Sequence, residues 1–261
     1  MNTLSRPPVI SIILPTYNGD VEKIKLAIHS IKDQSYSDFE CIIVDDSSKY
    51  EVINFLQSIS KTDQRFCYCR GKGEGLAAAL NLGLSMSRGE FIARVDDTDI
   101  SSLNRFELQI AYLRKNHNIG VVGSNYRFHR SGISMIRNYP EYHFGIMMSF
   151  LFSCPIAHSS VMIRRSILLN FNGYDETFFY CEDLELWLRL IRGGIKFGNI
   201  QRVLLYFDND LIIRSNQHFL SNSRARFKHS VNIFIGISFL ISLLHFVIPK
   251  FMRKQIKRIF E

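Results

Sequence analysis

The segment GEFIARVDDTD, residues 89–99, decides how this chain is expected to fold. Its apolar run, residues 91–95, is followed by the three carboxylates Asp96, Asp97 and Asp99. This pattern is typical of a buried parallel strand whose carboxyl end opens into a crevice, where open α/β sheets bind their ligands. Clustered carboxylates repel one another unless a cation neutralises them, and Mg²⁺ or Mn²⁺ suits oxygen ligands best. The alternative is a solvated acidic turn in which Asp99 or Ser101 caps the next helix.

Short apolar runs alternate with amphipathic stretches through the first part of the chain. Strands are expected at residues 9–14, 39–44, 66–69 and 91–95, and helices at residues 21–34, 51–60 and 76–87. This alternation predicts an α/β fold with a doubly wound, mostly parallel sheet. Polar segments follow three of the strands, at residues 16–18, 45–46 and 96–99. Because the carboxyl ends of parallel strands share one edge, we expect these segments to line a single crevice.

The pattern changes in the second part of the chain. A helix is expected at residues 103–115, strands at 119–122, 125–129 and 161–163, a turn at 131–132 and a further helix at 143–152. Asp183 is expected at the start of another helix, where an N-cap is the alternative to a functional role. Trp187 lies on the apolar face of that helix and is expected in the core.

Composition narrows the classes of protein. The chain has 261 residues, 46% hydrophobic content and 32 Lys and Arg against 24 Asp and Glu, a formal charge of +8. Such a charge favours nucleic acid, anionic lipid or a phosphorylated substrate, and the absence of a basic stripe with interleaved aromatic residues argues against nucleic acid. The five cysteines lack zinc spacing and predict reduced thiols in a cytosolic compartment. The N-terminus does not have the pattern of a signal peptide.

Several motifs, taken in order, resemble those of the family 2 glycosyltransferases. Residues 9–18 resemble the first strand and P-T-Y-N motif of that family, and residues 45–48 resemble D-D-x-S. Residues 75–83 resemble G-x-x-x-A-x-N-x-G, and residues 89–109 resemble G-E-Y-I-x-x-x-D-x-D-D followed by R-x-x-x-Q. Further matches, to H-x-S-x-M, G-x-D-E and E-D-x-x-L-W, lie at residues 158–162, 173–176 and 182–187. The resemblance spans residues 8–207.

The resemblance implies a GT-A fold, a nucleotide-sugar donor, a divalent metal and an inverting mechanism. It implies that Tyr17 stacks on the donor base, that Asp46 reads the edge of the base and that Asp183 is the general base. The positions implied in donor binding are Pro15, Tyr17, Asn18, Asp45, Asp46, Gly75, Asn81, Asp96 and Asp97. The positions implied on the acceptor side are His158, Glu182 and Trp187.

The sequence departs from the family pattern at the expected metal site. Thr98 stands where the family usually carries the aspartate that ligates the metal. Asp97 and Asp99 keep a D-x-D spacing shifted by one residue, so we expect Mn²⁺ or Mg²⁺ at these two carboxylates. A cation there would neutralise the negative charge that develops on a leaving nucleoside diphosphate.

The C-terminal segment differs from the rest of the chain. Residues 1–215 are expected to form the GT-A domain, with a donor half at 1–100 and an acceptor half at 101–215. Residues 216–261 are expected to form a basic and apolar helical segment, because the apolar run 231–248 has Lys and Arg on both sides. We expect an in-plane or re-entrant anchor on anionic lipid, with a membrane span or a docked helical pair as the alternatives.

Together these features predict an enzyme of surface-polysaccharide synthesis, such as that of O-antigen, lipopolysaccharide or capsule. It would transfer a hexosyl or N-acetylhexosaminyl group with inversion from a nucleotide sugar, with UDP-sugar expected, to a lipid-linked acceptor. The expected location is the cytoplasmic face of the bacterial inner membrane. One rival interpretation is a nucleotidyltransferase. Such an enzyme would need a basic loop after the first strand to bind phosphate, whereas residues 15–20 contain no Lys or Arg. The other rival is a non-catalytic homologue, which Thr98 favours.

Overall fold

The computed structural model describes residues 6–130, 132–150, 153–207 and 216–229. The strands are β1 (Ile10–Thr16), β2 (Phe39–Asp45), β3 (Phe66–Arg70), β4 (Phe91–Arg94), β5 (Asp99–Ser101), β6 (Ile119–Arg130), β7 (Ile133–Arg137), β8 (Met162–Arg164) and β9 (Lys196–Phe207). The helices are α1 (Val21–Lys32), α2 (Tyr50–Thr62), α3 (Leu76–Met86), α4 (Arg105–Lys115), α5 (His143–Ser149), α6 (Arg165–Asn170), α7 (Glu182–Arg192) and α8 (Asn216–Lys228), with a short 3-10 turn η1 at His158–Ser160.

One continuous sheet organises these elements. Its strand order is β3-β2-β1-β4-β8-β6-β9-β5, and β7 pairs with β6 at the side. β1 runs parallel to both β2 and β4, and β2 runs parallel to β3. β2 follows β1 on one side and β4 lies on its other side, which makes β1 a switch point. Open α/β sheets bind ligands in a crevice beyond the strand ends at such a point, and this region is called the crevice below. The parallel half of the predicted sheet is confirmed.

The second half of the sheet is mixed, so the prediction of a mostly parallel sheet was wrong there. β8 runs antiparallel to β4 and β6, and β5 runs antiparallel to β9. Among the described strands of this half, only β6 and β9 pair in parallel. A parallel pair needs a long crossover, whereas the tight turn that contains Gly132, with φ +76°, forces β6 and β7 into an antiparallel hairpin.

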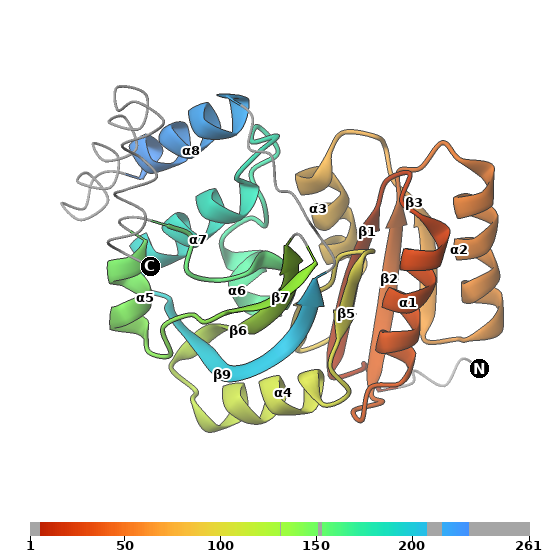
Figure 1. The fold of residues 1–261 in the computed structure, drawn as a ribbon, viewed down its shortest axis with the longest axis horizontal. Helices are drawn as coiled ribbons and strands as arrows, with labels where there is room; N and C mark the ends of the chain where they lie inside the picture. The colour runs from red at the N-terminus through yellow and green to blue at the C-terminus, as the bar shows by residue number, and fades with distance from the viewer. Residues whose placement is uncertain (1–5, 131, 151–152, 208–215, 230–261) are drawn as a thin grey trace.

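Helices cover both faces of the sheet (Figure 1). On one face, α1, α2 and α4 pack on alternate residues of the strands, for example on Ile12 and Leu14 of β1. On the other face, α3, α5, α6 and α7 pack on the intervening residues, such as Ile13 and Ile92. This alternation follows from the two-residue period of a strand, and burial on both faces explains why the first strands are almost wholly apolar.

The helix boundaries have local causes. The Asp20 carboxylate accepts hydrogen bonds from the backbone N–H groups of Glu22 and Lys23, at 2.8 and 3.3 Å, and so caps α1. Gly75 precedes α3 with φ +100°, a conformation that favours glycine. The two strands predicted at 119–122 and 125–129 are one strand, β6, whose register against β9 shifts near Ser124 and Asn125. That irregularity explains the break in the apolar pattern.

The predicted C-terminal anchor lies outside the described residues, because the apolar run 231–248 falls after the last described position, 229. Among the helices of the described part of the chain, none has both the length and the apolar character needed to cross a membrane. The described part of the predicted tail is α8, which packs on α7.

Candidate active site

The carboxyl ends of β1 and β4 meet in a direct contact. The Thr16 hydroxyl, at the end of β1, donates a hydrogen bond to the Asp97 carboxylate, which follows β4. Burial raises the pKa of Asp97, and this hydrogen bond opposes the rise. Gly19 lies against the same carboxylate, because a Cβ at Gly19 would stand 2.7 Å from Asp97 Oδ2. The predicted convergence of these two strand ends is thus confirmed.

Asn18 joins the ends of β1 and β2. It has φ +52°, and its side-chain Oδ1 accepts hydrogen bonds from the backbone N–H groups of Ser48 and Lys49, at 2.8 and 3.1 Å. Its own backbone N–H donates to Ser47 Oγ at 2.9 Å. Asn18 therefore shapes the loop that holds Tyr17 in solvent, where the Tyr17 side chain is 73% exposed. Pro15, by contrast, is buried within β1.

The two adjacent aspartates after β2 have different environments. Asp45 is buried and accepts hydrogen bonds from Tyr68 and Arg70, both at 2.9 Å. It also accepts one from the backbone N–H of Ser47 at 2.8 Å, and so fixes the loop that follows β2. Asp46 is half-buried at the crevice, and its Oδ1 accepts a hydrogen bond from the backbone N–H of Gly73 at 2.8 Å. Of the two predicted donor-binding carboxylates, Asp46 is therefore the one open to a ligand.

Arg94 is a site residue that sequence reasoning missed. It lies within the run 91–95, which is otherwise apolar, and a charged residue inside such a run is itself a signal. Arg94 is 5% exposed, and its guanidinium forms an ion pair with Asp96, whose side chain is 31% exposed. Its Nε has no hydrogen-bond partner among the described residues. The buried Arg94 cation thus pairs with one of the donor-side carboxylates, Asp96, and holds it in place.

The amino end of α7 supplies two further carboxylates, Glu182 and Asp183. Burial and the charge of Asp183 raise the pKa of Glu182 to about 7, the charge of Asp96 adds to the rise, and Arg94 opposes it. Carboxylates from the two halves of the chain therefore act on one another across this crevice.

Asp183 is the second residue of α7, and the N-cap position belongs to Cys181, with φ +60° and no side-chain cap bond. The alternative that Asp183 is an N-cap was thus wrong.

The predicted acceptor-side residues lie at different depths. His158 Nε2 lies 2.9 Å from the hydroxyl of Tyr174, and burial together with the charge of Arg94 holds the pKa of His158 well below its usual range. Trp187 is fully buried against Phe197 and His158, so it belongs to the core and does not reach the crevice surface. The core prediction for Trp187 is confirmed.

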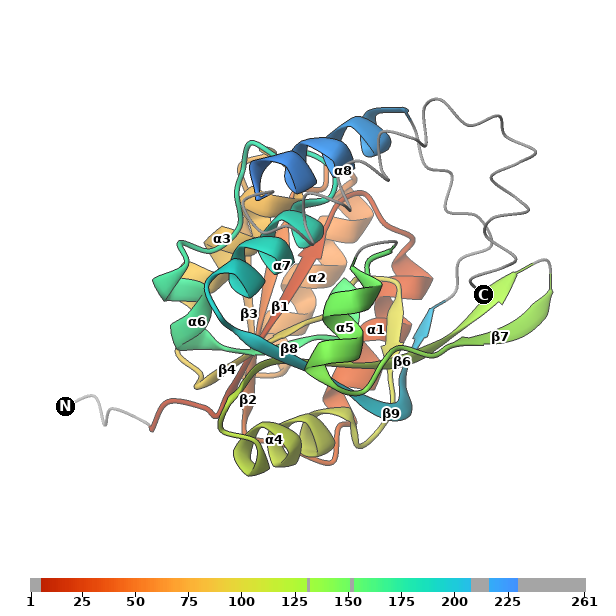
Figure 2. The ribbon, with the colours of Figure 1, turned by 90° about the vertical axis from the view of Figure 1, so that its left-hand side faces the viewer.

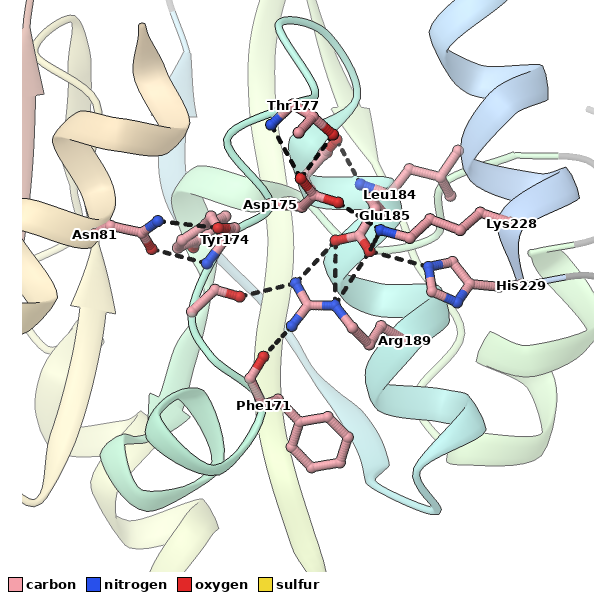
Figure 3. Close-up of polar contacts among 12 residues, drawn as sticks. Asn81, Phe171, Tyr174, Asp175, Thr177, Leu184, Glu185, Arg189, Lys228 and His229 are labelled. Atoms are coloured by element: carbon pink, nitrogen blue, oxygen red, sulfur yellow. Dashed lines mark hydrogen bonds and ion pairs between the residues drawn. The ribbon is translucent and has the colours of Figure 1, made fainter. Parts of the chain in front are cut away.

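Asn81 connects the two halves of the molecule. The Asn81 amide accepts a hydrogen bond from the backbone N–H of Tyr174 at 2.8 Å and donates to the backbone carbonyl of Tyr174 at 2.9 Å (Figure 3). It also donates to the Glu176 carboxylate at 2.7 Å. Both ends of the amide are therefore engaged in tying α3 to the loop 171–177. Gly75, at the start of the same helix, lies near the ring of Phe179.

A buried polar network anchors α8 on the helix that carries Asp183. Glu185 is 0% exposed and is contacted by Arg189, by His229 at 3.0 Å and by Lys228 at 3.2 Å (Figure 3). Lys228 also pairs with Asp175. Burial acts to raise the pKa of Glu185, but the hydrogen bonds from His229 and Arg189 outweigh it and lower the pKa to about 2. Because Glu185 lies in the first turn of α7, the network ties the end of the helix that carries Asp183 to α8.

The expected metal fits this crevice only in part. Mg²⁺ and Mn²⁺ are commonly held by one or two carboxylates, with substrate phosphates and water completing the shell. Asp96 and Asp97 are half-buried at the crevice and Thr98 lies beside them, so these residues can supply such a partial set. Asp99 is 0% exposed, and burial raises its pKa to about 7, so the structure places it beneath the crevice. In the described part of the chain no cluster of three or more His, Cys, Asp or Glu could hold a metal by itself.

Comparison with known proteins identifies the family. The model of the family described as glycosyl transferase family 2 matches residues 11–171. The chain belongs to glycosyl transferase family 2. This family 2 chain is 32% identical over 205 residues to the putative glycosyltransferase EpsE of Bacillus subtilis, an alignment that covers 76% of the chain and 72% of EpsE. It is 28% identical over 205 residues to the uncharacterized glycosyltransferase MJ1057 of Methanocaldococcus jannaschii, covering 77% of the chain and 70% of that protein.

Solved structures of glycosyltransferases share the fold. S. aureus TarS 1–349 in complex with UDP-GlcNAc matches with a TM-score of 0.65 at 16% identity, over 84% of this chain and 66% of that one. The mannosyltransferase PcManGT of Pyrobaculum calidifontis, in complex with GDP-Man and Mn²⁺, matches with a TM-score of 0.68 at 15% identity, over 92% and 71% of the two chains. At these identities the likeness establishes the GT-A fold of this family 2 member.

Proposed function

We propose that this family 2 glycosyltransferase transfers a sugar, with inversion, from a UDP-sugar to a hydroxyl group of a lipid-linked glycan. The observation that carries the proposal is the meeting of two sets of carboxylates at one crevice. Asp96 and Asp97 follow β4 in the donor half, and Glu182 and Asp183 begin α7 in the acceptor half. Arg94 pairs with Asp96, and the charges of Arg94, Asp96 and Asp183 all act on Glu182. A donor site that faces a base is the arrangement that a single displacement requires.

The chemistry divides between these two sets. Asp183 accepts the proton of the acceptor hydroxyl as its oxygen bonds to the anomeric carbon of the donor sugar. The bond from that carbon to the diphosphate oxygen breaks on the opposite face, and the nucleoside diphosphate leaves with the electron pair. One displacement inverts the anomeric centre and needs no covalent intermediate. A bound Mn²⁺ or Mg²⁺ would supply positive charge to the diphosphate, and Asp96 and Asp97 would hold it.

Donor recognition falls to the loops after β1 and β2. The exposed Tyr17 ring can stack on a base, and the open Asp46 carboxylate can accept hydrogen bonds from the base edge. TarS in complex with UDP-GlcNAc and PcManGT in complex with GDP-Man share the fold, which supports a nucleotide sugar as the donor. Asp45 would act indirectly, by supporting the loop that carries Asp46.

The lipid-linked acceptor rests on charge and hydropathy. The apolar run 231–248 with its basic flanks supports attachment to an anionic membrane, where an acceptor on a lipid carrier resides. This reasoning favours a role in the synthesis of a surface polysaccharide, at the cytoplasmic face of the membrane where nucleotide sugars are available. We propose a hexose or an N-acetylhexosamine as the transferred group, because the structural neighbours TarS and PcManGT are in complex with UDP-GlcNAc and GDP-Man.

Calorimetric titration with nucleotide sugars tests donor binding. We expect a UDP-sugar to bind in the presence of Mn²⁺ and to bind markedly more weakly after excess EDTA. The rival nucleotidyltransferase would instead form a nucleotide sugar from a nucleoside triphosphate and a sugar phosphate, with release of pyrophosphate. A non-catalytic homologue would bind a donor without ever releasing nucleoside diphosphate, even when acceptor glycans are present.

A further inference from the structure

The hairpin of β6 and β7 projects from the body of the molecule (Figure 2). Its strands pair from Tyr126 and Arg137 near the base to Arg130 and Ile133 at the turn. Three apolar side chains near the turn remain in solvent, namely Ile133 at 66% exposure, Met135 at 42% and Ile136 at 47%. Neighbouring apolar side chains that stay exposed on a projecting ribbon are typical of an interaction surface.

The hairpin is also basic. Residues 119–140 contain Arg127, His129, Arg130 and Arg137 and no Asp or Glu. The Arg127 guanidinium lies 6.0 Å from the ring centroid of Tyr206, and the Arg137 guanidinium lies 6.0 Å from that of Tyr139. Both cations therefore lie against aromatic rings, and no carboxylate of the hairpin itself neutralises them.

Apolar and basic residues are interleaved along the hairpin. Arg137 comes four residues after Ile133, which corresponds to about 13 Å along a strand that rises about 3.3 Å per residue. Arg127 pairs opposite Ile136, between the turn and the base. Arg130 pairs opposite Ile133 at the turn, so basic and apolar residues share the same levels of the hairpin. Amphipathic helices on a bilayer likewise bury apolar residues about 5–10 Å into the headgroup boundary while their basic residues stay near anionic lipid.

A hollow of about 230 Å³ extends the basic surface at the base of the hairpin. Lys23, Arg127 and His129 supply basic side chains to its wall. The other lining residues are Leu26, Thr98, Ile100, Tyr206 and Phe207. A hollow with basic side chains and an apolar lining suits a phosphate headgroup that carries a hydrocarbon chain.

We propose that the β6–β7 hairpin docks on an anionic lipid bilayer. Ile133, Met135 and Ile136 enter the headgroup region, and Arg127 and Arg137 contact lipid phosphates. The positive charge of the hairpin favours an anionic bilayer over a second copy of this chain as the partner. Two hairpins that both lack carboxylates would repel one another. The residues that make this contact differ from the carboxylates of the crevice and from the apolar run 231–248, so a reporter at the hairpin tip measures this contact directly.

Tryptophan fluorescence in the full chain tests the insertion. The sequence contains one tryptophan, Trp187, and it is fully buried, so Ile133→Trp adds a reporter at the tip over a constant background. We expect its emission to shift to the blue and to be quenched by brominated lipid in vesicles with phosphatidylglycerol, and not in purely zwitterionic vesicles. Leu169→Trp, at an exposed position on α6, is the matched control and should not be quenched.

Paired neutralisation tests the role of the cations. Adding Arg127→Gln and Arg137→Gln to the reporter should raise the vesicle concentration at half-quenching about 25-fold, because each basic residue near an anionic surface contributes about fivefold. The control variant is Lys61→Gln with Lys115→Gln, which removes the same charge at exposed positions of α2 and α4. We expect it to change the vesicle concentration at half-quenching by less than about twofold. Absence of quenching in every vesicle, or equal quenching in zwitterionic vesicles, would overturn the proposal. So would an emission that is already blue and concentration-dependent without vesicles, because a second copy would then cover the tip.

Discussion

Asp183 is the residue on which the proposed chemistry depends. Asp183→Asn removes the base but keeps an oxygen that can accept the hydrogen bond from the backbone N–H of Leu184, which measures 2.7 Å in the native protein. We expect kcat to fall about 10²–10⁴-fold, with the KM for donor and the melting temperature nearly unchanged. Steady-state kinetics and thermal unfolding measure these quantities. A variant that retained more than about a tenth of the native kcat, a loss of only ~1.4 kcal/mol, would exclude Asp183 as the base.

Glu182 is expected to tune that base. Burial and the charge of Asp183 raise the pKa of Glu182 to about 7, so Glu182 gains a proton as the pH falls below 7. Its negative charge favours proton uptake by the neighbouring Asp183, and this help disappears once Glu182 is protonated. We therefore expect kcat/KM to decline from pH 8 to pH 6, and Glu182→Gln to give a lower rate with little slope over that range. An unchanged profile in the Gln variant would show that Glu182 has no part in the chemistry.

Tyr17 and Asp46 are expected to determine donor affinity. Tyr17 is 73% exposed beside the crevice, and a base stacked on an aromatic ring contributes about 1–3 kcal/mol in comparable sites. Tyr17→Ala should therefore raise the KM for donor by about 5- to 150-fold, while kcat at saturating donor changes little. Asp46→Ala should act in the same direction. If both variants kept the native donor KM, the nucleotide base would have to bind elsewhere.

At the scale of elements, the docking of α8 is expected to hold α7 in place. Lys228→Met removes the ion pairs with Asp175 and Glu185, and hydrogen bonds to charged groups contribute about 1.5–3 kcal/mol each, less where solvent screens them. We expect a lower melting temperature at pH 7, whereas Lys228→Arg should remain close to native. Arg192→Met, at an exposed position of α7, is the control.

The pH dependence of that effect has a defined sign. Hydrogen bonds and ion pairs outweigh burial and lower the pKa values of Asp175 and Glu185 to about 2, whereas the unfolded carboxyls titrate near about 4. Their contribution to stability is therefore complete above about pH 4.5 and is lost as the pH falls toward about 2. The gap in melting temperature between native protein and Lys228→Met should close over that range. A gap that stayed constant down to pH 2.5 would mean that the ion pairs do not stabilise α8.

The elements differ in how well sequence predicts them. In the first half, each strand and helix is encoded by its own local pattern, so β1 to β4 and their crossovers could be predicted close to their true bounds. In the second half, pairing between distant strands decides the architecture: β8 inserts between β4 and β6, and the short β5 pairs with β9. No local pattern contains that information.

The residues of the site follow the same division: those at predicted strand ends could be predicted, and those that depend on distant contacts could not. The strand ends that carry Asn18, Asp46 and Asp97 follow from topology, whereas Arg94 was hidden within an apolar run. The burial of Asp99 depends on its incorporation into β5. The network around Glu185 depends on where α8 docks, which the sequence of α8 alone does not specify.

At the scale of the whole molecule, two membrane contacts are expected, the hairpin and the segment 231–261. Deleting residues 231–261 keeps Lys228 and His229 and should therefore leave α8 docked and activity on a water-soluble acceptor intact. The truncated protein should leave membranes at about 0.5–1 M salt, because salt screens the hairpin arginines, whereas the full chain should remain bound. Sedimentation with membranes measures this difference. A truncated protein that resisted high salt would locate the anchor elsewhere.

The central claim is that the crevice transfers a sugar from a nucleotide donor. Release of nucleoside diphosphate should be measured from a panel of UDP-, GDP- and dTDP-sugars, with acceptor glycans, in Mn²⁺ and in excess EDTA. We predict that one UDP-sugar gives release that depends on acceptor and metal and is lost in Asp183→Asn, with a product of inverted anomeric configuration. Release of no nucleoside diphosphate from any donor, or release that persists in Asp183→Asn and in EDTA, would contradict the account.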